Sequence, residues 1–557
     1  MNEDKKLIQY APVSKVAFYF CTGACILFFG PLIIFREAAQ PYVNIIMRFI
    51  THSTDWMWLV VVLGCLIFLL WLAFGPYGKV KLGKIDEEPE FSTFTWIAMI
   101  FQGSTGGALV YWSMVEPMYY MMWPPYWVEP VSAQSAQYAL SYAFMHWGIS
   151  AWTTFAVPAV VFAYSYYVRR KPYLFPSYAC REVLGKRLME GGGGKVLNAI
   201  LAFGMVGGMA TALGFVVPMM SNIFSNYVGI SDSAMLKVVI CLLFATIYIG
   251  SAYRGLHRGL ALLSNFNMYI AFALLGFVIL VGPTGFSLSL ATDNLGVYFN
   301  EYFRMSLYTD PVEKSGFPQD WTVFYWAWWL SWAIYIGLYC ARISKGRTIR
   351  SIILAMIAFG SLATFTFFTV FGGYIVDAML NRGMELGIIL SEEGGPAIVT
   401  WLMNDLPGTQ IVIPCILFYL LIGSSTCTDS AAYTLANMQC TEVKVGMEPP
   451  KWSRVYCGLL ILVCTIAVIL VGGRNVVQMA SVVPAIPLLP LMIVFCVTLR
   501  KWLKKDFGTS SLLTTDKYMD DSEDEEAATG TDKTYVSALE KAVKAAFKNK
   551  PSDIDED

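Results

Sequence analysis

The chain has 557 residues, of which 56% are hydrophobic and 14% are charged, and its formal net charge is −1. Charged residues are about half as frequent as in soluble domains, which favours a protein embedded in a membrane. A net charge close to zero argues against nucleic acid as a partner. One bundle of membrane-spanning helices would account for most of this length without the several cores that a soluble chain of this size needs.

Twelve cysteines and three histidines show no spacing typical of a metal site. Most cysteines lie inside apolar runs, no two form a C-x-x-C pair, and His52, His146 and His257 are far apart. We interpret these cysteines and histidines as small core residues. The sequence contains no nucleophile–base pair of the kind that would indicate an enzyme, so we do not expect one. The N-terminus, MNEDKKLIQYAPVSK, lacks the pattern of a cleaved signal peptide, so the first apolar run is expected to be a retained span.

Apolar stretches long enough to cross a bilayer recur along the chain. About 20 apolar residues in a helix span the hydrocarbon core, where only an internally hydrogen-bonded backbone is stable. The sequence therefore predicts an all-α polytopic membrane protein with twelve transmembrane helices. The stretches cover residues 16–35, 56–76, 94–122, 137–167, 196–226, 235–252, 259–284, 320–341, 350–376, 410–436, 455–472 and 476–500.

Lysine and arginine gather in alternate loops, as expected of loops on the cytoplasmic side. Seven lie in YYVRRKPYLFPSYACREVLGKRLMEGGGGK, four in ARISKGRTIR and three in GPYGKVKLGK, whereas TDNLGVYFNEYFRMSLYTDPVEKSGFPQD and NRGMELGIILSEEGGP, which we interpret as loops of the other side, hold few. We expect a multi-pass protein of the cell membrane with both termini in the cytoplasm. Its parts would be a cytoplasmic N-terminus (1–15), a transporter domain (16–504) and an acidic tail (505–557).

The tail begins with the acidic stretch TTDKYMDDSEDEEAATGTDK, whose low hydrophobicity is typical of disordered segments. Apolar residues at helical spacing follow, which predicts a short amphipathic helix. A solvated tail and a regulatory docking segment are both compatible with this pattern. The residues at this spacing are Val536, Leu539, Val543 and Phe547.

Residues 321–341, WTVFYWAWWLSWAIYIGLYCA, hold five tryptophans, four further aromatic rings and no charge. Helical spacing places Tyr325, Trp328, Trp329 and Trp332 on one face. An interfacial aromatic belt would lie at the ends of a span, whereas these tryptophans lie in its middle. Indole faces attract a quaternary ammonium group, which is weakly hydrated and donates no hydrogen bonds. The stripe therefore predicts a binding site for a trimethylammonium group.

A second aromatic set, HWGISAWTTF, lies in the fourth predicted span. Trp147 and Phe155 are two turns apart on one side of an ideal helix, whereas Trp152 is turned by about 140° from Trp147. Core packing and a shared pocket are equally compatible with this spacing.

The third predicted span contains the small-residue run GSTGGA at residues 103–108, which lets the helix unwind or lets a ligand approach the backbone. Close helix packing is the alternative. Glu116 is the only acid in this span, and a carboxylate at membrane depth usually has a partner or a function.

The tenth predicted span carries a polar stretch, GSSTCTDSAAYT, in an otherwise apolar helix. Its hydroxyl oxygens, together with loosened backbone carbonyls, would suit sodium. Hydrogen bonding between helices is the alternative. The polar residues are Ser424, Ser425, Thr426, Thr428, Asp429 and Ser430.

The segment WTVFYWAWWLSWAIYIGLYCARISKGRTIR resembles the betaine/carnitine/choline transporter (BCCT) family, whose signature is a tryptophan-rich helix followed by A-R-I-S-[KR]-G-R-[ST]-[IV]-R. The likeness extends through EPEFSTFTW, HWG, LYTDP and GFPQDWTVFYWAWW, over roughly residues 10–505. The part before the tryptophans is most similar to the carnitine/γ-butyrobetaine branch. The resemblance implies LeuT-like inverted five-helix repeats, formed by spans 3–7 and 8–12 after two extra helices, and a homotrimer.

The same resemblance implies a central substrate site between the repeats. Phe155 stands where relatives often have tyrosine, and Trp321 matches a position that lines an outer substrate site in the carnitine branch. The implied substrate-binding residues are Trp147, Trp152, Phe155, Tyr119, Trp321, Trp328, Trp329 and Trp332.

Coupling residues are implied in the same way. Sodium-independent exchangers of the family place an arginine and a methionine at the positions that match Asn267 and Ile336, so both substitutes are absent here. Cys427 stands where sodium-dependent members have serine, and Ser425 or Thr428 would compensate. The implied sodium positions are Thr105, Thr426, Cys427 and Thr211, and Glu116 is a further residue related to coupling.

We therefore expect a secondary active transporter of trimethylammonium zwitterions in the lipid bilayer, coupled to sodium, with no other cofactor. Sodium-independent exchange of substrate for product is the first alternative. A membrane receptor or osmosensor that binds betaines without transport is an alternative of another class.

Overall fold

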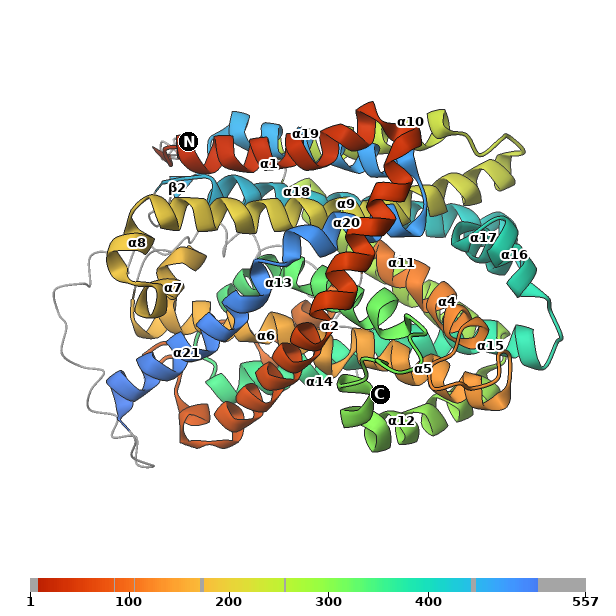
Figure 1. Ribbon diagram of the computed structural model, residues 1–557, viewed down its shortest axis with the longest axis horizontal. Helices are drawn as coiled ribbons and strands as arrows, with labels where there is room; N and C mark the ends of the chain where they lie inside the picture. Colours follow the sequence, from red (N-terminus) through yellow and green to blue (C-terminus); the bar gives the residue numbers. More distant parts are fainter. Residues whose placement is uncertain are drawn as a thin grey trace, which may run out of the picture.

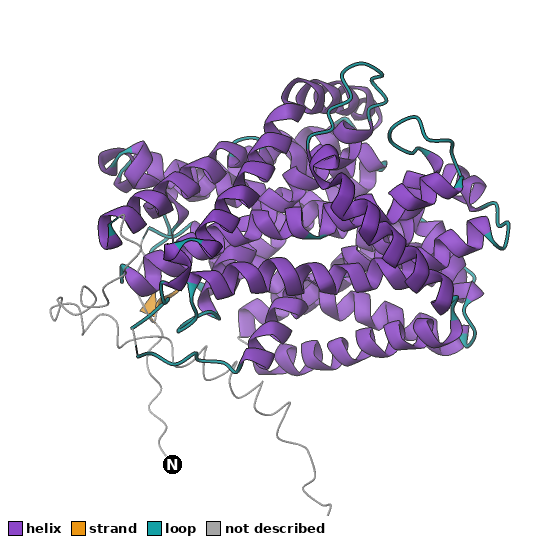
Figure 2. Cartoon of the chain, turned by 90° about the horizontal axis from the view of Figure 1, so that it is seen from below, coloured by secondary structure: helices purple, strands orange, loops and turns teal. Residues whose placement is uncertain are grey.

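The computed structural model describes residues 9–84, 86–104, 106–170, 175–254, 257–441 and 447–508. These residues are almost entirely helical, and long helices cross one another in a single bundle (Figures 1 and 2). The predicted tail helix around Val536 lies outside the described residues, as does Thr105.

The first half of the chain contains the 3-10 turn η1 (Pro76–Lys79) and the π-helical turn η2 (Tyr164–Val168). Its helices are α1 (Lys15–Ile34), α2 (Arg36–Phe74), α3 (Thr93–Ser104), α4 (Gly107–Met122), α5 (Ala133–Trp147), α6 (Ile149–Ala163), α7 (Pro176–Leu184), α8 (Lys186–Glu190), α9 (Gly192–Val228), α10 (Ala234–Arg254) and α11 (His257–Val281).

The second half contains the π-helical turns η3 (Pro318–Val323) and η4 (Phe368–Gly372). Its helices are α12 (Thr284–Ser306), α13 (Phe324–Arg342), α14 (Ile349–Phe367), α15 (Gly373–Leu380), α16 (Leu386–Glu392), α17 (Gly395–Asp405), α18 (Thr409–Met438), α19 (Lys451–Val471), α20 (Arg474–Ala485) and α21 (Leu488–Phe507).

Each of the twelve predicted spans overlaps a helix or two helices joined end to end, although α2 begins at Arg36, well before the predicted span 56–76. Among the described residues, eight helices are long and apolar enough to cross a membrane, or up to ten if each of two bent pairs is one span. The other two predicted spans are α3 with α4 and α13. α3 and α4 are each too short on their own, because α3 ends at Ser104 and α4 begins at Gly107, and the indole and phenol rings of α13 lower its hydropathy. The count of twelve spans stays a prediction.

The sequence prediction was wrong about part of the segment between the seventh and eighth spans, which we interpreted as a loop. There the chain turns by 104° after α11 and forms α12. Ser287, Ala291, Asn294, Tyr298 and Tyr302 recur every three or four residues on its buried face. This helix is amphipathic rather than apolar, so a search for apolar runs does not find it.

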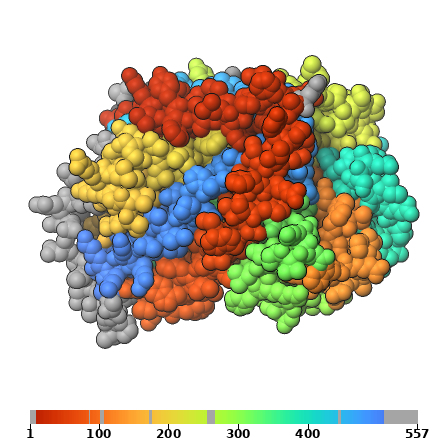
Figure 3. Space-filling model, viewed as in Figure 1, coloured from red at the N-terminus to blue at the C-terminus, as the bar shows by residue number. Residues whose placement is uncertain are grey.

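α13 lies in the interior of the bundle and packs against α6, α20 and α9. α20 and α21 also contact α2, which lies beside them across one face of the molecule (Figure 3). The close approach of α9 to its neighbours depends on two glycines. Gly207 faces the carbonyl oxygen of Ala480 in α20, and Gly208 faces Ser331 and Trp332 in α13.

The N-terminal residues are tied to the segment between α18 and α19. β1 (Gln9–Tyr10) pairs in parallel with β2 (Met447–Glu448) in a two-stranded sheet (Figure 2). The amide of Ala11 continues the ladder to the carbonyl oxygen of Glu448 at 2.8 Å. α1 then runs along α9 and α19.

Replacing Gly207 by alanine is expected to destabilise the protein, because the added methyl group would clash with the carbonyl oxygen of Ala480. Overpacking of this kind costs about 1–3 kcal/mol. The matched control is Gly276→Ala in α11, where an added Cβ meets nothing within 4 Å. We expect a lower midpoint of thermal unfolding in detergent for the first variant and an unchanged or higher midpoint for the control. Equal midpoints would contradict the close contact of α9 and α20.

Candidate functional site

Aromatic rings from α5, α6 and α13 meet in one cluster, formed by Trp147, Phe155, Trp328 and Trp329. The ring centroids of Trp147 and Trp329 are 4.7 Å apart, and the ring of Phe155 lies 5.9 Å from that of Trp329. Trp328 and Trp329 stack at 4.8 Å with their planes 15° apart. The structure thus brings together four of the residues that the sequence assigned to substrate binding. We call these four residues the aromatic cluster.

A break between α5 and α6 at Gly148 helps to position the cluster. The last carbonyl groups of a helix have no partner within that helix. One of them, on His146, accepts a hydrogen bond of 2.7 Å from Nε1 of Trp329. Nε1 of Trp328 donates to the carbonyl oxygen of Gly208 at 3.2 Å. Both indoles of the stack are therefore fixed by backbone groups of neighbouring helices.

The rings of the cluster contact one another closely. A group inserted between two stacked rings needs about 3.5 Å on either side, so the rings would have to be about 7 Å apart. The observed separation of 4.8 Å between Trp328 and Trp329 is smaller. Trp147, Phe155 and Trp329 retain 5%, 7% and 7% exposure, whereas Trp328 retains 1%. A ligand would therefore reach the cluster at Trp147, Phe155 and Trp329.

Two further predicted residues lie beside the cluster. Trp152 contacts Phe155 edge to face at 5.5 Å, and its ring packs so closely on Gly360 of α14 that no side chain fits there. Trp332 lies against Gly208, and its Nε1 is buried without a hydrogen-bond partner in the described part of the chain. Trp328 and Trp332 therefore both reach Gly208 of α9, whereas Trp329 is directed toward α5 and α6.

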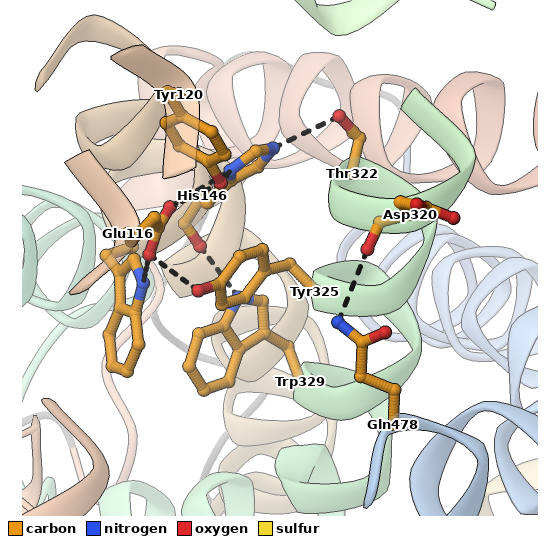
Figure 4. A network of polar contacts seen from close by, with 9 residues as sticks. Glu116, Tyr120, His146, Asp320, Thr322, Tyr325, Trp329 and Gln478 are labelled. Carbon is orange, nitrogen blue, oxygen red and sulfur yellow. Dashed lines mark hydrogen bonds and ion pairs between the residues drawn. The ribbon is translucent and has the colours of Figure 1, made fainter. Parts of the chain in front are cut away.

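The carboxylate of Glu116 is fully buried beside the cluster and is the centre of a polar network (Figure 4). Its Oε2 accepts hydrogen bonds from Nε1 of Trp147 at 2.7 Å and from the hydroxyl of Tyr325 at 2.5 Å. Its Oε1 accepts one from the hydroxyl of Tyr120 at 2.7 Å and lies 3.2 Å from Nδ1 of His146. The network joins α4, α5 and α13.

The oxygens of a carboxyl group accept hydrogen bonds. Burying such a group is costly unless these oxygens have partners. Glu116 meets this requirement with protein donors, so its oxygens are already engaged. It therefore positions the indole of Trp147 and the ring of Tyr325 for the cluster.

Tyr119 and Trp321 form a second aromatic pair, with ring centroids 5.1 Å apart. Trp321 also meets Tyr120 edge to face at 5.0 Å, which links the pair to the Glu116 network. The guanidinium carbon of Arg474 lies 4.7 Å from the ring of Trp321 and 5.1 Å from that of Tyr119. We call these two rings the Tyr119/Trp321 pair.

The predicted sodium positions lie on α9 and α18. Thr211 donates to the carbonyl oxygen of Val477 at 2.9 Å, Thr426 donates to that of Ile422 at 2.8 Å, and the side chain of Cys427 is half-buried. Within the described ranges no three His, Cys, Asp or Glu side chains form a metal-binding group. Any cation site here would therefore use hydroxyl, amide and carbonyl oxygens.

The coupling positions Asn267 and Ile336 are both buried. The amide of Asn267 faces Gly423 at the contact of α11 with α18. Its Oδ1 and the hydroxyl of Ser425 in α18 are buried without a hydrogen-bond partner among the residues that the structure describes. Buried oxygens normally have a hydrogen-bond partner or bind an ion, so the two oxygens at this contact are compatible with binding a small cation.

Comparison with protein families matches residues 16–508 to the model of the betaine/carnitine/choline family transporters, BCCT. The match extends from α1 to α21 and includes the aromatic cluster. The chain belongs to the BCCT family. This BCCT protein is therefore a multi-pass membrane transporter, as the sequence predicted, and the match does not distinguish the carnitine branch from the others.

Several residues of the BCCT site were missed or misjudged from the sequence. The prediction that the histidines are core residues is right for His146 and wrong for His52, which is exposed. Nε2 of His146 lies 3.1 Å from the hydroxyl of Thr322, and its Nδ1 faces Glu116. Tyr120 lies one helical turn after Glu116, a spacing that favours contact between side chains. No comparable signal pointed to Arg474, because its partners come from distant segments.

Replacing Glu116 by glutamine is expected to lower the midpoint of thermal unfolding, because an amide nitrogen would face donors. A buried group left unsatisfied costs about 1–3 kcal/mol. Tyr325→Phe should be less damaging in the Glu116→Gln background than alone, since its hydrogen bond is already disturbed. The control is Tyr302→Phe, whose hydroxyl bonds Ser150 at 2.7 Å outside the network, and which should act additively. Additive effects of Tyr325→Phe would show that its hydroxyl does not depend on Glu116.

Proposed function

We propose that this BCCT protein is a secondary active transporter of trimethylammonium zwitterions of the glycine betaine, carnitine or γ-butyrobetaine type. The observation that supports this proposal is the aromatic cluster of Trp147, Phe155, Trp328 and Trp329 in the interior of the bundle. Three indoles within reach of one another offer the faces that a quaternary ammonium group prefers.

The chemistry of the cluster suits a site that both loads and releases its ligand. Each aromatic face contributes on the order of 1 kcal/mol to the binding of a desolvated cation. A free buried carboxylate would hold the ammonium group more firmly, but the oxygens of Glu116 already accept bonds from Trp147, Tyr325 and Tyr120. Entry of the ammonium group would separate Trp147 from Trp329, because the rings are now in contact.

Alternating access is the proposed mode of transport. The predicted architecture has twelve spans, and spans 3–7 and 8–12 form inverted repeats in a homotrimer with both termini in the cytoplasm. Helix breaks at Gly106 and at Gly148 support this architecture, because transporters of such folds use interrupted helices around their sites. In this proposed architecture the cluster would combine rings of spans 4 and 8, which belong to different repeats.

The cluster is tested by replacing Trp329 with leucine. We expect affinity for glycine betaine and γ-butyrobetaine to fall about tenfold, since losing one aromatic face from a desolvated site costs about 1–2 kcal/mol. Trp332→Leu tests the other predicted tryptophan of α13. The control is Trp58→Leu in α2, a side chain that is also buried and donates a hydrogen bond to Thr54. Binding of radiolabelled ligand to the purified protein measures the effect, and unchanged affinity in Trp329→Leu would contradict the proposal.

Sodium symport is the proposed form of coupling. Thr426 and Thr211 are the expected ligands, and Cys427 and Thr105 are the neighbouring positions implied by the resemblance. The buried oxygens of Asn267 and Ser425 support a cation site at the contact of α11 with α18. Inward movement of one positive charge at ~100 mV would contribute about 2.3 kcal/mol to accumulation.

Coupling is tested in proteoliposomes. Replacing sodium by potassium is expected to abolish accumulation of labelled glycine betaine, and Thr426→Ala should raise the sodium concentration needed for half-maximal uptake. Symport of a zwitterion with sodium moves charge, so a current should accompany uptake. Sodium-independent, electroneutral exchange would instead support the substrate/product antiporter. Binding without any accumulation would support the receptor or osmosensor.

A further inference from the structure

Arg474 is the first residue of α20, and its guanidinium group lies over the Tyr119/Trp321 pair. Both distances, 5.1 and 4.7 Å from the ring centroids, are within the range of cation–π attraction. The protein's own cation thus covers two aromatic faces that would attract an ammonium group.

The position of Arg474 is accessible from solvent, in contrast to the indole of Trp321. Its side chain is 28% exposed and that of its ion-pair partner Asp320 is 53% exposed, whereas Trp321 is 3% exposed. From Trp321 a continuous series of contacts leads inward. Trp321 meets Tyr120, which bonds Glu116, which in turn bonds Trp147 of the aromatic cluster. Arg474 therefore lies at the solvent end of this series.

The guanidinium group retains capacity for another anion. Arginine has five N–H donors in a planar fork that matches a carboxylate. Within the described part of the chain, its ion pair is with Asp320, and Nη2 lies 3.4 Å from Oδ2. Strong pairs of this kind are 2.7–2.9 Å long, so this contact is a weak one. A carboxylate arriving from solvent can replace it.

We propose that Arg474 recognises the carboxylate of the substrate and excludes quaternary ammonium compounds that have none. A zwitterion exchanges the weak contact with Asp320 for its own carboxylate, and its ammonium group then takes the faces of the Tyr119/Trp321 pair. A compound such as choline offers no anion, and it must displace a cation of the same sign from those faces. This inference rests on the proposed function and specifies its substrate class as zwitterions.

The test compares KM for labelled glycine betaine, γ-butyrobetaine and choline in proteoliposomes that contain the wild type, Arg474→Gln or Arg474→Lys. The matched control is Arg304→Gln. The guanidinium carbon of Arg304 lies 4.1 Å from the ring of Tyr126, away from the series of contacts. The thermal unfolding midpoint of each variant is measured in parallel, so a general loss of folded protein is visible.

In the wild type, KM for choline should exceed KM for both zwitterions. Arg474→Gln should reduce the ratio of choline KM to betaine KM about tenfold, the usual effect of one charge-assisted hydrogen bond. Arg474→Lys should reduce it less, because it keeps the charge and loses the fork. Arg304→Gln should leave the ratio unchanged. A merely structural role would change KM for all compounds alike.

An unchanged ratio in Arg474→Gln, or a wild type that prefers choline, would overturn the role of Arg474 while leaving transport of ammonium compounds intact. A wild type that carries none of the three compounds would refute the proposed function itself, and the role of Arg474 with it. The two failures are therefore distinguishable in the same experiment.

Discussion

The burial of one carboxylate determines how the centre of this protein is built. Glu116 has no solvent contact, so its oxygens depend on donors supplied by Trp147, Tyr120 and Tyr325. These donors come from α4, from the next helix α5 and from α13, which is distant in sequence from both. Each donor must approach within about 3 Å, so the carboxylate fixes how α4, α5 and α13 sit relative to one another.

The helices approach this centre closely because small residues and helix breaks remove obstacles. Gly208 leaves room on α9 for the indoles of α13, and the break at Gly148 frees a carbonyl group that binds Trp329. Large rings of α13 therefore pack where the neighbouring helices carry small residues or a break. This is the packing that dense interiors require, and a larger residue at Gly208 would push α13 away from α9.

The sequence predicted the helical spans and the aromatic character of α13 because both depend on local patterns. It did not predict which helix each indole of the stripe meets, since contacts with other helices decide this: Trp328 and Trp332 reach Gly208 of α9, and Trp329 bonds His146 of α5. α12 was missed because its pattern is amphipathic. Arg474 was missed because it meets Tyr119, Trp321 and Asp320 only through the tertiary fold.

The pairing of Gln9–Tyr10 with Met447–Glu448 has a consequence for biosynthesis. Gln9 and Tyr10 are synthesised long before Met447 and Glu448, which follow α18. During most of translation β1 therefore has no strand to pair with, and contacts between distant segments form slowly. The ladder therefore closes late, and a nascent chain that stops before residue 447 leaves α1 without this attachment.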